Sequence, residues 1–186
     1  RADLIGPDMA HSLSLLQDRL PAFGPALARR QVMQETGAPL EETFRRFDDI
    51  PVAAASIAQV HYAELADGRQ VAVKLLRPGI RRRMQADTTL FYSLALILEW
   101  LAPNLRRLKL VTAVDQFTRI SEIELDLRLE AAAAGKLADN MAGDDGIHVP
   151  WADLEHTTSA MLVIEWVEGI RIDDIAGLEA AGHDIG

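Results

Sequence analysis

The sequence predicts an α+β fold, in which a small antiparallel sheet has a long helix behind it and a helical extension before it. Two apolar runs of alternating polarity, residues 57–65 and 70–76, flank an Asp67-Gly68 turn. Asp-Gly between such runs is typical of a β-hairpin. Apolar residues recur at helical spacing both before and after this hairpin. This order of helices, hairpin, helices and a final strand is expected for an α+β arrangement.

Residues 1–50 are predicted to form the helical extension. Apolar residues at helical spacing predict a helix over residues 13–20, which Pro21 ends. A second helix is expected over residues 25–35, before a glycine and a proline. A short third helix is expected over residues 39–47, with two phenylalanines on one face.

After the hairpin, the sequence predicts two helices and a last strand. The first helix covers residues 80–101 and is closed by Pro103. Its apolar stripe is interpreted as a core contact rather than a membrane surface; the stripe consists of Leu90, Leu94, Ile97, Leu98 and Leu101. The longest predicted helix runs over residues 112–141, with Thr112 as its N-cap. Residues 159–167 are expected to form a buried strand.

Composition limits the classes of function. The chain has 186 residues, a formal net charge of −9 and no cysteine. The missing cysteine excludes disulfides and thiolate zinc sites, and the histidines lack metal-ligand spacing, so we predict no metal site in this chain. Nucleic-acid-binding domains usually carry the opposite charge, so nucleic acid is not an expected partner. The most apolar stretch, residues 90–102, is about half of a bilayer-spanning length.

An alanine-rich loop before a strand that carries a lysine is the most specific feature. Protein kinases hold nucleotide phosphates with the pattern G-x-G-x-x-G-x-V, followed by a V-A-I-K strand. Here alanines stand at the three glycine positions, in Ala53-x-Ala55-x-x-Ala58-x-Val60, and the strand reads Val71-Ala72-Val73-Lys74. Alanine still lets the backbone approach phosphate but gives up the freedom of glycine at positive φ. We therefore expect a phosphate loop that is stiffer than a glycine-rich one.

A kinase-type site also needs a helix carboxylate that holds the strand lysine. The predicted long helix offers Glu122, Glu124, Asp126 and Glu130. A helix cannot aim all of these at Lys74, so one is expected to be its partner. The alternative is that these acids form a solvated face with pairs four residues apart.

His61 follows the loop. Because it has no partner in the sequence pattern, we interpret it as structural rather than catalytic.

Together these motifs resemble the UbiB (aarF-domain) family of atypical protein kinase-like proteins. The residues that carry the resemblance are Ala53-Ala54-Ala55-Ser56-Ile57-Ala58-Gln59-Val60-His61, Val71-Ala72-Val73-Lys74, Arg77-Pro78, and Glu124-Leu125-Asp126 leading to Glu130. The resemblance implies a kinase-like small lobe over residues 51–186 that ends near the hinge. Residues 1–50 would be the family's N-terminal extension, and the large lobe is expected beyond this chain.

The resemblance also implies roles for individual residues. Lys74 would bind phosphate, Glu130 would be its helix partner, and Glu124 and Asp126 would form the family's Glu-x-Asp motif. Ile164 would be the gatekeeper before a hinge of Glu165, Trp166 and Val167. The expected nucleotide-binding residues are Ala53, Ala54, Ala55, Ser56, Ile57, Ala58, Val60, Ala72, Lys74, Ile164, Glu165, Trp166 and Val167. The cofactor would be ATP or ADP with Mg²⁺, and the metal ligands are expected in the large lobe.

By resemblance, the whole protein would be an atypical kinase or ATPase that supports ubiquinone or other prenyl quinone biosynthesis. Implied partners are an adenine nucleotide, prenyl quinone precursors, an anionic membrane surface and quinone-biosynthesis proteins. The implied location is cytoplasmic and peripheral to the inner membrane, with any membrane anchor outside this chain. The family's Lys-x-Gly-Gln, the His-x-Asp catalytic loop and Asp-Phe-Gly do not occur here, so this chain alone is expected to be inactive.

Two other readings stay open from the sequence. The loss of all three loop glycines also fits a catalytically inactive pseudokinase module, which binds nucleotide or prenyl lipid and scaffolds quinone-biosynthesis enzymes. A weaker reading is a soluble α+β domain in which the motif occurs by chance.

Overall fold

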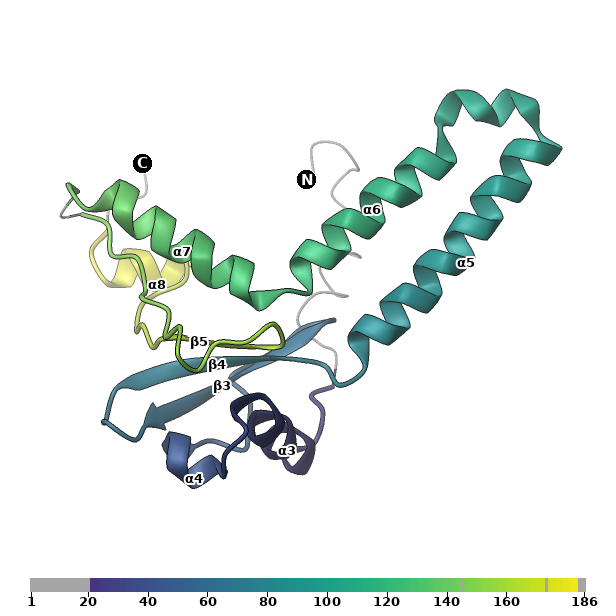
Figure 1. Cartoon of the computed structure of the whole chain (residues 1–186). Coiled ribbons are helices and arrows are strands. Elements are labelled where there is room, and N and C mark those ends of the chain that lie inside the picture. The colour runs from purple at the N-terminus through teal and green to yellow at the C-terminus, as the bar shows by residue number, and fades with distance from the viewer. Residues whose placement is uncertain (1–20, 145, 173, 184–186) are drawn as a thin grey trace.

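The computed structural model describes residues 21–144, 146–172 and 174–183, and it confirms the predicted α+β class (Figure 1). The helices are α3 (Pro25–Thr36), α4 (Leu40–Thr43), α5 (Ile80–Leu101), the short 3-10 helix η1 (Pro103–Leu108), α6 (Leu110–Glu124), α7 (Leu127–Met141) and α8 (Ile175–Ala180). The strands are β1 (Phe44–Phe47), β2 (Ala53–Ala54), β3 (Ala58–Leu65), β4 (Gln70–Leu76) and β5 (Met161–Glu165).

The sheet is antiparallel, in the order β1-β3-β4-β5, and β2 pairs with β3 as well. The predicted hairpin is present: β3 and β4 pair from Ala58 opposite Leu76 to Glu64 opposite Gln70. Gly68 in the turn between them has a φ of 91°, which glycine adopts without strain. The predicted last strand, residues 159–167, is present as the shorter β5, which pairs with β4.

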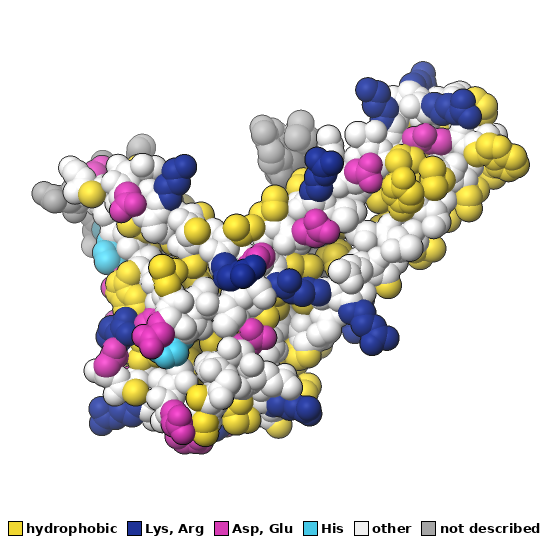
Figure 2. Space-filling view, in the orientation of Figure 1, with side chains coloured by type: hydrophobic (Ala, Val, Ile, Leu, Met, Phe, Trp, Pro, Cys, Tyr) yellow, Lys and Arg dark blue, Asp and Glu magenta, His cyan; other side chains and the backbone are white. Residues whose placement is uncertain are grey.

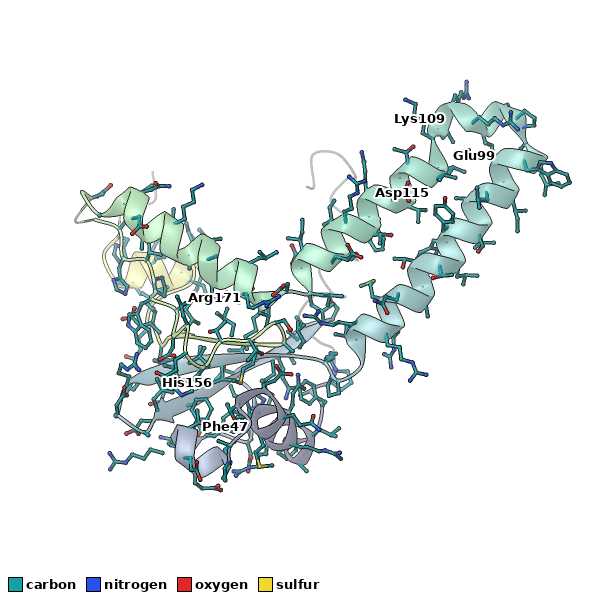
Figure 3. All side chains as sticks on the ribbon, viewed as in Figure 1. Phe47, Glu99, Lys109, Asp115, His156 and Arg171 are labelled. Carbon is teal, nitrogen blue, oxygen red and sulfur yellow. The ribbon has the colours of Figure 1, made fainter. Side chains whose placement is uncertain are left out.

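Helices cover both faces of the sheet. On one face, α3 and β1 bury Val32, Phe44 and Phe47 against Val71 and Val73 of β4. Figure 3 shows Phe47 on this side, beside α3 and α4. On the other face, the start of α7 packs on β4 and β5, and this cluster consists of Ala58, Leu76, Leu125, Leu127, Ala131 and Leu162. The two clusters hold the sheet between α3 and α7 (Figure 1).

The prediction of a third helix over residues 39–47 is wrong. The helix ends at Thr43, and Phe44 begins strand β1. The register with β3 shifts between Phe44 and Arg46, and such a bulge changes which side chains share a face. In a regular strand, residues three apart point to opposite faces. Because of the bulge, Phe44 and Phe47 are both buried, and this spacing resembles that of an apolar helix face. The helix predicted over residues 13–20 lies outside the described residues.

The predicted long helix over residues 112–141 is two helices. It begins at Leu110, so Thr112 is not the N-cap, and it is interrupted after Glu124. Asp126 has an extended backbone (φ −115°) and its side chain accepts a hydrogen bond from the Arg128 backbone N–H. Aspartate is among the preferred N-cap residues, so Asp126 starts a new helix rather than continuing the first one.

The helical hairpin of α5, η1 and α6 projects away from the sheet (Figure 1). Only Thr88 and Ala95 of α5 are buried, whereas Leu90 is 57% exposed and Leu101 is 64% exposed. The prediction that this apolar stripe is a core contact is therefore wrong for the described part of the chain. Figure 2 shows apolar side chains open to solvent along the hairpin. None of the described helices combines the length and the apolar character that crossing a membrane requires.

His61 lies in the core. Its ring stacks on Phe47 with centroids 4.8 Å apart, and its side chain is fully buried. Nδ1 is 2.7 Å from the Asp48 carbonyl oxygen and therefore donates to it, while Nε2 is 2.7 Å from Gln59 Nε2 and accepts. These contacts require a neutral ring and agree with a structural role.

We predict that His61 makes the fold sensitive to mild acid. Burial lowers the pKa of this imidazole below its ordinary value of 6.5, although the Asp48 carbonyl opposes the shift. The unfolded chain therefore binds a proton at a pH where the folded chain does not, and stability falls as the pH drops below 6.5. The expected slope is up to about 1.4 kcal/mol per pH unit.

Denaturant unfolding between pH 8 and pH 5 tests this prediction. The free energy of unfolding should fall more steeply in the unaltered protein than in His61→Gln, which cannot titrate. His148→Gln serves as the control, because the His148 side chain is 63% exposed. Parallel pH curves for the unaltered protein and His61→Gln would contradict the prediction.

Candidate active site

One face of the sheet gathers four of the residues predicted to line a nucleotide site. Val60 lies opposite Lys74 in the β3–β4 pairing, and Ala72 lies opposite Ile164 in the β4–β5 pairing. Side chains alternate along a strand, and directly paired residues share a face, so all four belong to the same face. This is the face that α7 covers. Val60, Ala72 and Ile164 are half-buried and present a largely apolar surface beside the lysine.

Lys74 and Glu130 form an ion pair across this face. Lys74 Nζ donates to Glu130 Oε2 over 2.7 Å. Glu130 lies in the first turn of α7, which the Asp126 cap fixes over the sheet. The two side chains are 29% and 48% exposed, so the pair is open to water and its contribution to stability is small. Of the four acidic candidates, Glu130 is the one that the structure brings to Lys74.

The alanine-rich segment forms the turn from β2 into β3. Ala53 and Ala54 make up β2, and the Ala55 N–H donates to the Ala58 carbonyl over 2.8 Å. Ala58 is buried, whereas Ser56 at the turn is exposed. Within the described residues, this segment contains no positive φ. Alanine therefore suffices in this conformation, and glycine is not required by the backbone.

The Arg77 side chain stabilises this turn through hydrogen bonds to its backbone. Its Nε and Nη2 atoms both donate to the Ala55 carbonyl oxygen, over 3.0 and 2.9 Å. Its backbone N–H donates to the Ile57 carbonyl over 2.7 Å, and Ile57 packs half-buried against the core on the α7 side. The residue after the lysine strand thus fixes the shape of the loop. The family resemblance assigns no role to Arg77-Pro78, and these bonds indicate that Arg77 supports the alanine-rich turn.

The Glu-x-Asp residues lie at the junction of α6 and α7. Glu124 is the last residue of α6 and is exposed. Asp126 accepts two hydrogen bonds from the Arg128 guanidinium, over 2.9 and 2.6 Å. These bonds lower the pKa of the Asp126 carboxyl despite the opposing effect of desolvation. Neither acid has a hydrogen bond to Lys74 in the described part of the chain. The spacing of four residues would place Asp126 and Glu130 on one face of a continuous helix, but Asp126 is the extended N-cap of α7 and lies outside that helix.

The predicted hinge residues follow the end of β5. Glu165 lies opposite Val71 and therefore on the face away from Lys74. Its Oε2 is 2.8 Å from His148 Nε2 and accepts the Trp151 backbone N–H over 3.2 Å.

Trp166 closes this end of the sheet. Its ring meets Tyr62 edge to face, with centroids 5.1 Å apart, and its backbone N–H donates to the Gln70 carbonyl. Val167 is 50% exposed. The segment is thus anchored to the sheet edge by Glu165 and Trp166, while the chain leaves the sheet at Val167.

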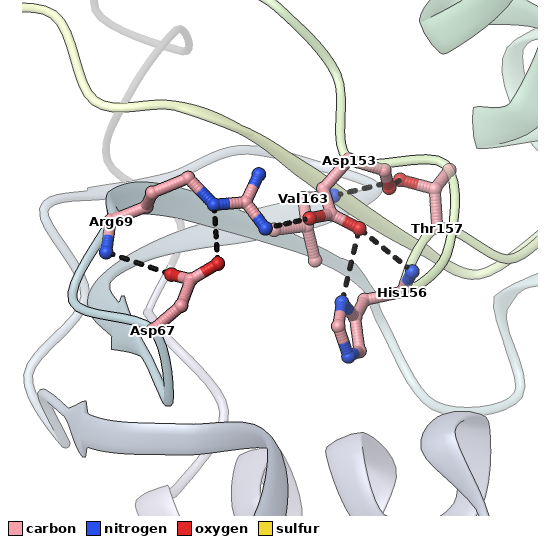
Figure 4. Close-up of polar contacts among 6 residues, drawn as sticks. All are labelled: Asp67, Arg69, Asp153, His156, Thr157 and Val163. Atoms are coloured by element: carbon pink, nitrogen blue, oxygen red, sulfur yellow. Dashed lines mark hydrogen bonds and ion pairs between the residues drawn. The ribbon is translucent and has the colours of Figure 1, made fainter.

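Sequence reasoning missed a polar cluster that supports β5. The Asp153 side chain is 5% exposed and bonds Arg69 Nη2 over 2.9 Å and the His156 ring over 3.0 Å (Figure 4). Burial by itself would raise the pKa of the Asp153 carboxyl, but the bonds from His156 and Arg69 outweigh burial and lower the pKa. Thr157 Oγ1 accepts the Val163 N–H, which ties this cluster to β5. No motif spacing pointed to the cluster, because Arg69 and Asp153 are far apart in sequence.

Comparison with known proteins gives a family and several relatives. Residues 15–185 match the ABC1 atypical kinase-like domain family. The chain is 41% identical over 186 residues to a probable protein kinase UbiB of Aeromonas hydrophila, and the matched region covers 100% of this chain and 34% of that protein. It is 42% identical over 182 residues to a probable protein kinase UbiB of Marinobacter nauticus, covering 98% and 33%. The chain spans about a third of the length of these curated relatives.

A solved structure has the same fold. It is that of Rv3197 from Mycobacterium tuberculosis, determined as a complex with erythromycin. The TM-score is 0.69 at 30% sequence identity, over 94% of this chain and 44% of that chain. These similarities confirm the kinase-like fold class that the sequence predicted.

Proposed function

The chain belongs to the family of ABC1 atypical kinase-like domains that includes the UbiB proteins, and from this premise we propose that it is the nucleotide-binding small lobe of an ATP-dependent enzyme. In this proposal Lys74 binds the phosphates of ATP or ADP and Glu130 holds the lysine in place. The alanine-rich turn covers the phosphates, and residues 164–167 frame the adenine.

The observation that carries this proposal is the Lys74–Glu130 ion pair on a half-buried, largely apolar face. A nucleotide needs a positive charge for its phosphates and a flat apolar surface for its base. The half-exposed ion pair leaves the lysine accessible, since its amine has two further protons to donate. Ala72 and Ile164 supply small or apolar side chains beside it. The residues present therefore fit a nucleotide.

Magnesium belongs to the same proposal. Magnesium would neutralise charge on the phosphates, and we propose that its ligands lie in the remainder of the full-length protein. Within the part of the chain that the structure describes, no group of three or more acidic or histidine side chains could hold a metal ion. The residues of this chain are thus proposed to position the nucleotide, and catalysis is proposed for the full-length protein.

The biological role proposed for the full-length protein is support of ubiquinone or another prenyl quinone pathway, with prenyl quinone precursors and the enzymes of that pathway as partners. The UbiB name of the relatives supports this role. The second candidate, a pseudokinase scaffold without turnover, is favoured by one observation: alanine stands at all three glycine positions of the phosphate loop.

Steady-state ATP hydrolysis by the full-length protein separates the two candidates. We expect turnover in the presence of a prenylated phenol and of vesicles with anionic lipid, and we expect Lys74→Ala to remove it. Turnover that equals that of Lys74→Ala, together with intact nucleotide binding, would favour the scaffold.

We also propose that the full-length protein associates peripherally with an anionic membrane, and that the projecting hairpin makes the contact. Its tip joins exposed apolar and basic side chains, namely Trp100, Leu101, Leu108, Arg106, Arg107 and Lys109. Trp100 is 73% exposed. Figure 2 shows the basic and apolar groups side by side at the end of the hairpin, where Figure 3 places Lys109. Tryptophan and cations together suit the interface of an anionic bilayer.

We predict that reversing two charges at the tip weakens this association. Each basic residue near such a surface contributes about 1 kcal/mol, so Arg106→Glu/Arg107→Glu should reduce the vesicle partition coefficient by about tenfold or more. Sedimentation with phosphatidylcholine vesicles that contain phosphatidylglycerol measures it. Arg45→Glu is the control, because Arg45 is an exposed residue of β1, in the sheet. Arg45→Glu changes the net charge by half as much, so a loss of binding free energy half as large as that of the double variant would mean that overall charge, not the tip, causes binding.

A further inference from the structure

A groove lies where α3 meets the connection from β4 to α5. Its volume is about 480 Å³. It is lined by residues of α3, among them Arg30 and Gln31, and by residues 76–82. The helix α3 packs on the sheet face of Val71 and Val73, which is opposite to the face of Lys74. Lys74 does not line the groove, so the groove is a different surface from the proposed nucleotide site, and Arg77 is the lining residue that also bonds the alanine-rich turn.

Four arginines line this groove, namely Arg30, Arg77, Arg81 and Arg82. In a chain of net charge −9, none of the four forms an ion pair with a described carboxylate. Arg77 and Arg81 are held by backbone carbonyls of Ala55, Leu125 and Ser159. Arg30 and Arg82 make no bond to a described residue and are exposed. Glu35 is the acid in the lining, and its carboxylate accepts the Thr158 hydroxyl.

The start of α5 adds to the positive potential. This helix has no side-chain N-cap and no acidic residue in its first turn; instead, Arg81, Arg82 and Arg83 follow its first residue. The N-terminus of a helix carries partial positive charge and free N–H groups, so cations there are unfavourable unless an anion is bound. Arginine also suits phosphate, because its planar guanidinium can donate two parallel hydrogen bonds.

A buried amide in the same groove points to a hydrogen-bond donor on the ligand. Gln31 is 7% exposed, and its Nε2 donates to the Leu76 carbonyl over 2.7 Å. Its Oε1 is the buried side-chain atom without a hydrogen-bond partner in the described part of the chain. An acceptor left unpaired in the interior is unfavourable, and a ligand hydroxyl beside the phosphate would satisfy it.

We propose that this groove is a binding site for a phosphate ester that carries a hydroxyl group, distinct from the nucleotide site. The phosphate lies at the start of α5 and binds Arg82 of that helix and Arg30 of α3. Arg77 and Arg81 act as fixed positive charges beside it. The hydroxyl donates to Gln31. The same chemistry occurs in a soluble glycerol phosphate and in the headgroup of a glycerophospholipid.

Calorimetric titration of the full-length protein with sn-glycerol 3-phosphate and with inorganic phosphate tests the site. The Lys74→Ala background removes phosphate binding at the nucleotide site. In that background we expect glycerol 3-phosphate to bind, and Arg82→Ala and Arg30→Ala each to weaken binding about tenfold or more. Arg83→Ala is the matched control, because Arg83 is exposed on α5 but does not line the groove. Binding that both groove variants retain overturns the proposal.

A vesicle arm distinguishes the source of the phosphate. If glycerol 3-phosphate gives no heat, vesicles of phosphatidylcholine with phosphatidylglycerol are added to the same variants. Sedimentation that Arg82→Ala weakens more than Arg107→Ala assigns the groove to a lipid headgroup. No binding in either arm, or vesicle binding that depends on Arg107 and not on Arg82, overturns the site. Because nucleotide-induced thermal stabilisation should stay intact in Arg82→Ala, failure of this proposal leaves the nucleotide site untouched.

Discussion

Replacing Lys74 by alanine should abolish the thermal stabilisation that ADP or ATP gives to the full-length protein. A ligand at about a hundred times its dissociation constant stabilises a protein by about 2.7 kcal/mol. Removing the amine takes away charge-assisted hydrogen bonds to phosphate, each of about 1.5–3 kcal/mol, so affinity should fall by about 10–100-fold or more. Differential scanning fluorimetry across a nucleotide concentration series measures this loss.

The fold itself should survive this change. The Lys74–Glu130 pair is partly exposed, at 29% and 48%, so its loss should cost less than about 1 kcal/mol of stability. Lys136→Ala is the matched control, since Lys136 is an exposed lysine of α7. If Lys74→Ala keeps the full nucleotide-induced shift, the phosphate-binding role of Lys74 is wrong. If it melts far below the unaltered protein without nucleotide, the pair is structural instead.

Glu130 acts through Lys74 and is therefore a positioning residue in this scheme. The pair joins β4 to α7, two elements that also share the core around Leu127 and Leu162. A lysine held by a carboxylate on a packed helix keeps its amine over the sheet before nucleotide arrives. Preorganisation of this kind lowers the entropy that binding must overcome. The position of α7 on the sheet thus links the core of the lobe to its proposed site.

The parts of this site that could be predicted from the sequence depend on local patterns. The hairpin with Asp67-Gly68 in its turn fixed the register that places Val60 opposite Lys74. The alternation of β4 then determined which face Lys74 and Ala72 share. Such features depend on neighbours in the chain, and turn chemistry encodes them directly. The choice of Glu130 among four acids came from family resemblance, since spacing left several open.

The parts that could not be predicted depend on tertiary context. Periodicity across residues 112–141 continued through Asp126, where the Leu127 N–H donates to the distant Ser159 carbonyl and Asp126 caps a new helix. The bulge after Phe44 let a strand bury two phenylalanines at helical spacing. The apolar character of α5 predicted burial, yet among the described residues most of this helix contacts only α6 and η1, and its large apolar side chains stay exposed. In each case a long-range contact, or the lack of one, decided the outcome that local pattern had left ambiguous.

Replacing Asp153 by alanine should lower the stability of the protein by about 2–3 kcal/mol. Its buried carboxylate accepts bonds from Arg69, from the His156 ring and from the His156 backbone N–H, and hydrogen bonds to charged groups contribute about 1.5–3 kcal/mol. The cost stays below that of a fully buried pair because Arg69 is 45% exposed and regains water. The Asp153 backbone N–H also donates to Val163 of β5, so loosening this loop should weaken the strand that leads to the proposed hinge.

Asp67 provides the control for Asp153, because both carboxylates bind the same arginine. Asp67 is 51% exposed, so Asp67→Ala should have a much smaller effect on denaturant unfolding than Asp153→Ala. The pH dependence has a defined sign. The pKa of the Asp153 carboxyl in the folded protein lies below its ordinary value of 3.8. The carboxylate therefore stabilises the fold fully above pH 3.8, and this stabilisation is lost as the pH falls from there through the lower pKa of the folded protein. The unaltered protein should therefore lose its advantage over Asp153→Asn in strong acid, and equal stabilities of the two at neutral pH would show that the carboxylate does not support β5.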